Sequence, residues 1–312
     1  MQPLTLPVVA VSVGDLNGIG IGIALQAHTA VTALCRPRYC ISRPLLEQAA
    51  RLLGREIPDD FETVDVPGSV TIRPGRVDAD SGRYAYDSFM KAVALCETGE
   101  ADAVTTLPVH KEAWMKAGLP FKGHTDLLRR HFGAEAIMML GCESLYVALF
   151  TEHMPLREVP KAIEREALTR FLLDFQRETG AERIAVLGLN PHAGDNGVLG
   201  DEERIIEAAI ETAERHVPGT FTGPVVPDVA FTPGFRKNFR YFVAMYHDQG
   251  LAPLKALYFD ESINVSLNLP IVRTSVDHGT AFDIAYKTLP DDRSYRNAVQ
   301  AAVSLAAKRA GR

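Results

Sequence analysis

Short runs of apolar, often β-branched residues alternate along most of the chain with segments whose apolar residues recur at helical spacing. The expected strands cover residues 7–13, 103–106, 145–150, 184–189, 242–245 and 264–267. The expected helices cover residues 21–33, 84–97, 112–116, 127–130, 164–179 and 202–215. Strands that alternate with helices predict an α/β fold with a mostly parallel sheet.

Length and composition refine this picture. The 312 residues suggest two domains, if a domain takes about 150 residues. With 46% hydrophobic and 23% charged residues, the chain has the composition of an ordinary globular protein. A net charge of -6 and a pI near 5.9 leave no basic stripe for nucleic acid.

The chain also lacks the marks of membrane insertion or secretion. No apolar stretch reaches the roughly 18 residues that a transmembrane helix needs. The segment 1–13 leads directly into a glycine-rich turn, which favours a first strand over a signal peptide. The four cysteines form neither a CxxC pair nor a dense framework, so a reducing, cytoplasmic setting is expected.

Three histidines follow three of the expected strands. His153 comes after the run LYVALFTE, His192 after IAVLGLNP and His247 after YFVAMY. Parallel strands place their carboxyl ends at one edge of the sheet, where ligands bind. Three imidazoles that converge there suit Zn²⁺ or a similar metal with one coordination position left open. The alternative is that each histidine is a loop residue bonded to backbone or water.

Three further segments combine glycine with polar residues. The segment 14–22 joins the first strand to the first helix, and its amide groups suit an anion unless they only form a tight turn. Its glycines are spaced GxGxG, which is not the Rossmann fingerprint. The segment 273–283 precedes an expected helical run, where Ser275 and Thr280 are candidate helix caps. In the segment 123–126, Thr125 is a candidate cap and His124 a candidate ligand contact.

These segments give the chain a family resemblance. The motifs GHTDLL from Gly123, LNPHAG from Leu189, YHDQGLAPLK from Tyr246 and NVSLNLPIVRTSVDHGTAFDIA from Asn264 occur in this order. Together they resemble the PdxA family of 4-hydroxythreonine-4-phosphate dehydrogenases in vitamin B6 biosynthesis, over nearly the whole chain. Where the family often has GDPAGIGPE and TGPxxK, this chain has GDLNGIGIG and TLPVHK, which puts the ligand role of both loops in question.

The resemblance implies a fold and an assembly. The fold is expected to be like that of isocitrate and isopropylmalate dehydrogenases, with an active-site cleft between two domains. One domain would comprise residues 1–122 and 262–312, and the other, carrying the metal histidines, residues 123–261. The active site would be completed by the partner subunit of a homodimer.

The resemblance also implies the site residues. A divalent metal (zinc, magnesium or cobalt) would lie on His153, His192 and His247. The substrate would contact His124, Thr125, Lys255, Asn264 and Arg273. NAD or NADP would bind at the segment similar to the HGSAPDIAG motif of the related dehydrogenases, through His278, Gly279, Thr280 and Asp283.

The expected reaction oxidises the secondary alcohol of 4-phosphohydroxy-L-threonine to a ketone, with hydride passing to the nicotinamide. The β-keto acid then loses CO₂ to give 3-amino-2-oxopropyl phosphate. Arg273 and Lys255 suit the anionic groups of this substrate, since arginine can fork onto phosphate and lysine acts as a point charge. Lys111 is the first candidate for proton transfer and Asp248 the second.

Three different functions remain open from the sequence. The same scaffold can oxidise another phosphorylated hydroxy acid or a dihydrodiol carboxylate. Three histidines around an open metal position also suit a hydrolase, which would turn over without nicotinamide. A small-molecule binder would show no turnover at all.

Overall fold

The computed structural model describes residues 6–311, and the chain forms two compact units. Unit 1 comprises Met1–Ala134, Ile263–Val265 and Leu269–Arg312; unit 2 comprises Glu135–Ser262 and Ser266–Asn268. The predicted domain boundaries lie between residues 122 and 123 and between residues 261 and 262. The boundaries between the two units lie after Ala134 and within β10 (Ile263–Leu267). Residues 1–5 and 312, which the first predicted domain includes, lie outside the described residues.

Unit 1 is built on a parallel sheet. Its strands run in the order β3-β2-β1-β4-β11, and every neighbouring pair in this order is parallel. The central β1 has the sequence VVAVS and is almost wholly buried, as expected for a strand covered on both faces. The strand bounds are β1 Val8–Ser12, β2 Arg36–Cys40, β3 Thr63–Val64, β4 Ala103–Thr106 and β11 Arg273–Val276.

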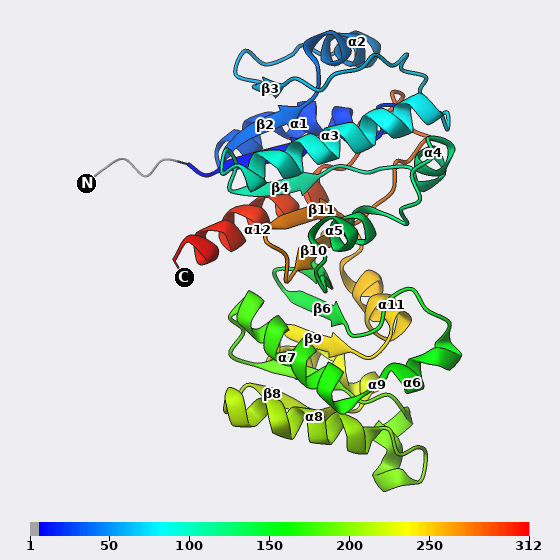
Figure 1. The fold of residues 1–312 in the computed structure, drawn as a ribbon, viewed down its shortest axis with the longest axis vertical. Helices are drawn as coiled ribbons and strands as arrows, with labels where there is room; N and C mark the ends of the chain where they lie inside the picture. The colour runs from blue at the N-terminus through cyan, green and yellow to red at the C-terminus, as the bar shows by residue number, and fades with distance from the viewer. Residues whose placement is uncertain (1–5, 312) are drawn as a thin grey trace, which may run out of the picture. The chain divides into compact units, whose positions relative to one another are not determined.

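Helices cover this sheet. The long α3 packs on β1, β2 and β4, while α12 packs on β4 and β11 (Figure 1). Asp78 caps α3 by accepting a hydrogen bond from the amide of Asp80, which satisfies one of the free amides at the helix start. The helix bounds are α1 Gly20–Thr32, α2 Arg43–Leu53, α3 Ala79–Glu97, α4 Lys111–Lys116, α5 His124–Phe132 and α12 Arg293–Ala310.

Unit 2 contains a mixed sheet in the order β5-β6-β9-β7-β8. The pair β5–β6 is antiparallel, and the pairs β6–β9, β9–β7 and β7–β8 are parallel. The strand bounds are β5 Ile137–Cys142, β6 Leu145–Leu149, β7 Ile184–Leu187, β8 Phe221–Val225 and β9 Tyr241–Ala244. Three neighbouring strands, β6, β9 and β7, therefore point their carboxyl ends toward the same edge.

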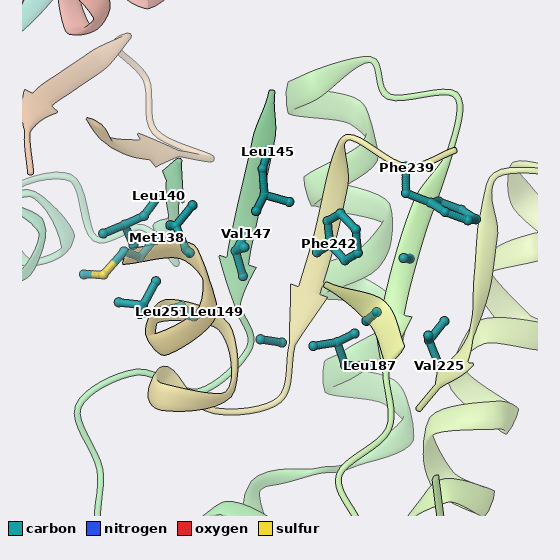
Figure 2. Packing of buried hydrophobic residues seen from close by; sticks show 14 residues of the cluster. Met138, Leu140, Leu145, Val147, Leu149, Leu187, Val225, Phe239, Phe242 and Leu251 are labelled. Carbon is teal, nitrogen blue, oxygen red and sulfur yellow. The ribbon is translucent and has the colours of Figure 1, made fainter. Parts of the chain in front are cut away.

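The core of unit 2 fixes these strand ends. Leu149, Leu187 and Phe242 project from β6, β7 and β9 into one buried apolar cluster (Figure 2). Helix α11 packs on β5, β6 and β9, and α7 packs against α8. The helix bounds are η1 Leu156–Glu158, α6 Val159–Ala162, α7 Arg165–Thr179, η2 Pro191–Gly197, α8 Glu203–His216, α9 Pro227–Ala230, α10 Pro233–Arg236 and α11 His247–Tyr258.

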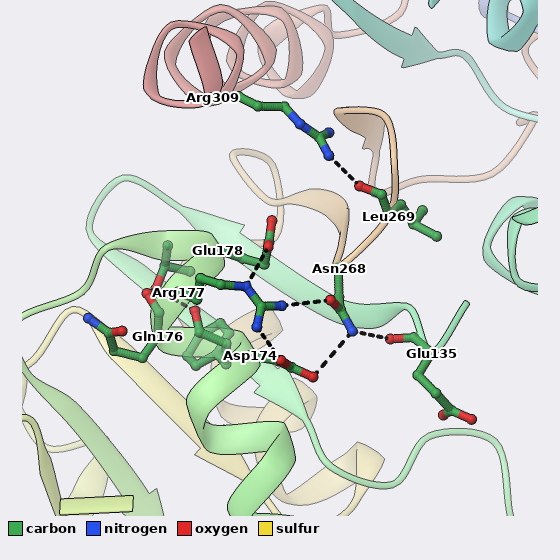
Figure 3. A network of polar contacts seen from close by, with 10 residues as sticks. Glu135, Asp174, Gln176, Arg177, Glu178, Asn268, Leu269 and Arg309 are labelled. Atoms are coloured by element: carbon green, nitrogen blue, oxygen red, sulfur yellow. Dashed lines mark hydrogen bonds and ion pairs between the residues drawn. The ribbon is translucent and has the colours of Figure 1, made fainter. Parts of the chain in front are cut away.

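A polar network connects the first and the last residue of unit 2 to helix α7 (Figure 3). Asn268, in the left-handed region with φ 59°, accepts a hydrogen bond from Arg177 at 2.9 Å and donates one to the carbonyl of Glu135 at 2.9 Å. Arg177 is held in turn by Asp174 at 2.6 Å. The residues at which the chain enters and leaves unit 2 are thus joined through one helix.

Most predicted elements agree with the structure to within a residue or two, and β4 agrees at both ends. The helical run expected after residue 283 is wrong, because that segment forms turns and α12 begins only at Arg293. Ser275 is not a helix cap but lies inside β11, and Thr280 lies in a loop. Helix α5 begins at His124 after Gly123, so Thr125 is not its cap either.

The α-helices of both units range from 4 residues in α6 to 19 residues in α3. Among residues 6–311, none combines the length and the apolar character that crossing a bilayer requires.

Candidate functional site

The three histidines singled out in the sequence follow three neighbouring parallel strands of unit 2. His153 follows β6, His247 follows β9 and His192 follows β7. In the sheet register, Leu149 lies beside Ala244 and Val186 beside Val243, so the three strands end at nearly the same level. The strand order thus brings all three histidine loops to one edge of one sheet.

Two of the three imidazoles are close together. The ring centres of His153 and His247 lie 5.4 Å apart with an interplanar angle of 45°. His247 Nδ1 is 2.7 Å from Asp248 Oδ1, a contact that leaves its Nε2 for another ligand. Among residues 6–311, no group of three His, Cys, Asp or Glu side chains is close enough to hold a metal.

His192 lies in an unusual turn. Five consecutive residues, from His192 to Asn196, have positive φ values between 44° and 77°. Left-handed backbone costs an L-residue about 1–2 kcal/mol, so such a run persists only where its surroundings hold it. The buried carboxylate of Glu203 anchors the residues that lead into the run, accepting hydrogen bonds from the amides of Leu189 at 2.9 Å and Asn190 at 2.7 Å.

In unit 1, a buried guanidinium lies at the start of β11. Arg273 is 2% exposed and donates hydrogen bonds to Thr106 Oγ1 at 2.8 Å and Asn264 Oδ1 at 3.4 Å. Burial lowers the pKa of Arg273 to about 9, so the side chain is still cationic at neutral pH. Both of these hydrogen bonds go to neutral oxygens and hold the guanidinium in place.

His124 lies near this cation. It is 9% exposed, and its ring meets the edges of Phe89 and Trp114 with centres 4.6 Å and 5.5 Å away. Burial, followed by the charges of Arg273 and Lys111, holds the pKa of His124 well below its usual value. Its Nε2 makes no hydrogen bond to any described residue, so a neutral imidazole has a buried polar atom to offer a ligand.

Lys111, predicted for proton transfer, and the other predicted substrate residues divide between the units. Lys111 begins α4, and a Cβ placed on Gly123 would lie 3.9 Å from its Cε. Thr125 is buried next to His124 in unit 1. Lys255 belongs to unit 2, where its Nζ lies 5.7 Å from the ring centre of Phe259. Unit 1 by itself therefore brings together Arg273, Asn264, His124 and Lys111.

The segment predicted to bind nicotinamide forms a loop between β11 and α12. The carbonyl of Thr280 accepts a hydrogen bond from Ile19 at 3.1 Å, and Phe282 stacks on His110 with ring centres 4.6 Å apart. His278 is half-buried and turns Nδ1 toward the carbonyl of Gly279, whereas Gly279 and Asp283 are exposed. The loop thus contacts the turn that precedes α1.

That first turn is packed, and four of its amides donate to groups of unit 1. The amides of Asp15 and Ile19 donate to the carbonyls of Pro108 and Thr280. The amide of Asn17 donates to the side chain of Asp15, and the amide of Gly18 donates to the carbonyl of Asp15. A Cβ on Gly14, whose φ is 71°, would lie 2.2 Å from the carbonyl oxygen of Pro108. Gly14 therefore serves a tight turn, which agrees with the second of the two interpretations at the start of this segment.

Comparison with known proteins decides the family. A family model described as "Pyridoxal phosphate biosynthetic protein PdxA" matches residues 33–302 of the chain. The chain belongs to the PdxA family.

Individual members of the PdxA family and its relatives are similar over nearly the full length. The 4-hydroxythreonine-4-phosphate dehydrogenase of Sulfurimonas denitrificans is 61% identical over 298 residues, which cover 95% of this chain and 97% of that one. The crystal structure of the Klebsiella pneumoniae enzyme of the same name has a TM-score of 0.84 at 31% identity, covering 98% of this chain and 99% of that one. A terephthalate 1,2-cis-dihydrodiol dehydrogenase from Burkholderia xenovorans has a TM-score of 0.69 at 26% identity, covering 96% and 98%.

Several buried polar residues of this PdxA-family chain were not predicted from the sequence. Glu203 and Gln249 support the histidine loops, and Asp15 anchors the first turn through Ser81 and the amide of Asn17. Burial raises the pKa of Asp15. Only the Asp-x-Asn spacing at Asp15 hinted at a turn, because the other contacts join residues distant in sequence.

Proposed function

We propose that this chain oxidises 4-phosphohydroxy-L-threonine with NAD⁺, or NADP⁺, to the 3-keto acid, which loses CO₂ to give 3-amino-2-oxopropyl phosphate. This reaction belongs to vitamin B6 biosynthesis. The observation that carries the proposal is the 61% identity, over 95% of the chain, to a relative named 4-hydroxythreonine-4-phosphate dehydrogenase. The buried, cationic guanidinium of Arg273 in unit 1 supports an anionic substrate.

The substrate phosphate is assigned to unit 1. Arg273 offers a charged fork that Thr106 and Asn264 hold in place. His124, kept neutral, can donate or accept one hydrogen bond through Nε2, and Thr125 follows it at the start of α5. Lys111 is assigned to proton transfer, with Lys255 contributing a further cation to the substrate.

A divalent cation, zinc, cobalt or magnesium, is assigned to His153, His192 and His247. Three imidazoles suit zinc or cobalt better than magnesium, and the 5.4 Å between two of the ring centres suits shared ligation. When bound, the cation would supply positive charge that stabilises the oxyanions of oxidation and decarboxylation. Asp248 orients His247 through Nδ1 and is the second candidate for moving a proton.

Nicotinamide is assigned to the loop His278–Asp283, where Thr280 is buried and Asp283 exposed. The bound nucleotide would accept the hydride, while the chain positions it and excludes competing reactions. A homodimer that completes each active site is part of the proposal. The four free thiols suit the reducing cytoplasm.

The decisive assay combines purified protein, NAD⁺, a divalent metal and 4-phosphohydroxy-L-threonine. We expect NADH and CO₂ to appear in equal amounts, and 4-hydroxy-L-threonine without the phosphate to be a far poorer substrate. Turnover without nicotinamide would instead indicate a hydrolase, and ligand binding without turnover a binding protein.

A second candidate is oxidation of a dihydrodiol carboxylate. The 26% identity and TM-score of 0.69 to the terephthalate dihydrodiol dehydrogenase favour this activity over hydrolysis or simple ligand binding. The same assay run with a dihydrodiol carboxylate and with other phosphorylated hydroxy acids separates these activities. NADH formation from the dihydrodiol alone would overturn the main proposal.

A further inference from the structure

The imidazole of His124 packs against two aromatic rings from two different helices. It meets Phe89 of α3 and Trp114 of α4 nearly edge to face, with interplanar angles of 78° and 79°. Both of these aromatic side chains are 0% exposed. Ring pairs favour this geometry over other arrangements at such distances. Two buried, rigid neighbours therefore restrict the orientations that the imidazole can adopt.

A second buried histidine of unit 1 is held in a different way. His28 is 1% exposed, and the ring centre of Phe61 lies 4.9 Å from its own. Its Nδ1 lies 3.0 Å from the hydroxyl of Tyr39, and its Nε2 lies 3.0 Å from a carboxylate oxygen of Asp60. Hydrogen bonds thus orient His28. No residue within 6–311 provides such a bond to Nε2 of His124, which leaves the direction of this atom to the neighbouring rings.

Trp114 is itself fixed by the contact between α3 and α4. Its ring meets that of Tyr86 on α3 with centres 6.2 Å apart and an interplanar angle of 82°. The backbones also approach closely, since a Cβ on Gly82 of α3 would lie 2.9 Å from the amide nitrogen of Trp114. The indole is therefore placed independently of α5, the helix that His124 begins.

We propose that Phe89 and Trp114 are positioning residues that hold the His124 imidazole with Nε2 directed at the phosphate group of the substrate. The inference rests on the proposed function, in which His124 and Arg273 receive this phosphate. Loss of either ring would let the imidazole turn away, so its hydrogen bond to the phosphate would weaken. The guanidinium of Arg273, held by Thr106 and Asn264, would keep its place.

The test uses the purified full chain with the substitutions Phe89→Leu and Trp114→Phe, which keep both positions apolar. Calorimetry measures the binding of inorganic phosphate, and steady-state kinetics measures KM and kcat with 4-phosphohydroxy-L-threonine. We expect phosphate affinity to fall and KM to rise about tenfold, comparable to the loss of one hydrogen bond to a charged group. The value of kcat should stay nearly unchanged, because the lost contact serves ground state and transition state alike.

The comparison with His124→Asn separates positioning from simple packing. If Phe89 acts through the imidazole, Phe89→Leu should weaken phosphate binding no further in a chain that already carries His124→Asn. If Phe89 only fills the core, the losses of the two single variants should add in the double variant. The same cycle applies to Trp114→Phe.

Phe61→Leu is the matched control. Phe61 is 4% exposed, belongs to the same unit and stacks on Tyr39 with ring centres 3.8 Å apart. Like Phe89, it is a buried ring beside a buried histidine. Its replacement should lower the thermal midpoint of unfolding and leave both phosphate affinity and KM at wild-type values.

The outcomes discriminate between the inference and the function on which it rests. Folded Trp114→Phe protein with wild-type phosphate affinity and KM would overturn the positioning role, and this milder variant keeps the test valid if Phe89→Leu does not fold. Phosphate binding that is absent in the wild-type protein, or unaffected by His124→Asn, would refute the assignment of His124 to the phosphate and the positioning role with it. Phosphate binding without dehydrogenase activity would refute only the proposed reaction.

Discussion

Arg273 combines a buried, well-packed position with its proposed role in binding the substrate phosphate. It begins a buried strand, and its guanidinium reaches Thr106 on β4 and Asn264 on β10. A lysine would keep the charge but lose the planar fork that makes both contacts. The residue is thus expected to be sensitive even to a substitution that preserves charge.

Arg273→Lys should raise KM for the phosphorylated substrate about 10- to 100-fold, equivalent to losing one charged hydrogen bond. Steady-state kinetics with the phosphorylated substrate measures this. Arg309→Lys is the control, because Arg309 belongs to the same unit and donates at 2.8 Å to the carbonyl of Leu269, which is not a predicted site residue. An unchanged KM in Arg273→Lys would contradict the phosphate assignment.

His124 makes a prediction about pH. Its pKa is lower in the folded chain than its ordinary value of about 6.5. As pH falls below that value, the unfolded chain takes up a proton that the folded chain does not, so the free energy of unfolding falls. In His124→Asn, the free energy of unfolding should lack this dependence on pH, whose slope is at most about 1.4 kcal/mol per pH unit. Urea unfolding between about pH 7.5 and 5.5 tests this, and parallel curves for both proteins would refute it.

Helix α3 meets α4 at a glycine, and this contact can be tested at the scale of elements. A Cβ on Gly82 would lie 2.4 Å from the backbone of Ala113, whereas a Cβ on Gly22 in α1 would lie 3.6 Å from the side chain of Leu53. Helix propensity alone favours alanine at both sites by about 1 kcal/mol. Steric overlap should make the substitution by alanine destabilising only at Gly82.

Gly82→Ala should therefore lower the free energy of unfolding by about 1–3 kcal/mol, as overpacking does. Gly22→Ala should raise it by up to about 1 kcal/mol. Because α4 begins at Lys111, the first variant should also reduce kcat. Equal effects of the two substitutions in urea unfolding would show that α3 and α4 do not pack this closely.

Local sequence determines some elements of this fold, and tertiary contacts determine others. The strands β1, β4, β6, β7 and β9 were predictable because each is an apolar run followed by polar residues. This pattern also located His153, His192 and His247. The turns after residue 283 were not predictable, since Ala281 and Tyr286 adopt positive φ and Tyr286 donates a hydrogen bond to Leu16, far away in sequence.

The supporting side chains could not be predicted from the sequence for a similar reason. Gln249 gains its role from Gly188, and Glu203 from Leu189 and Asn190, only after the strands have assembled. Glutamate and glutamine near a helix start are normally solvated, so nothing in the pattern marked these two as buried. Tertiary contacts, and not local propensity, give them their function.

At the scale of the whole molecule, metal binding should be coupled to stability. A ligand that binds only the folded state, present at 100 times its dissociation constant, stabilises by about 2.7 kcal/mol. Thermal unfolding with Zn²⁺ or Co²⁺ should therefore show a raised midpoint that a chelator reverses. His192→Ala should lose both this rise and turnover, and a full rise in that variant would exclude His192 as a ligand.

The interrupted path of the chain through unit 1 has a consequence for biosynthesis. The strand β11, which brings Arg273 and pairs with β4, follows the whole of unit 2 in the sequence. On the ribosome, unit 2 can thus be made in full while the sheet of unit 1 still lacks this strand. Until β11 has been made, the nascent chain lacks Arg273, the residue proposed to hold the substrate phosphate.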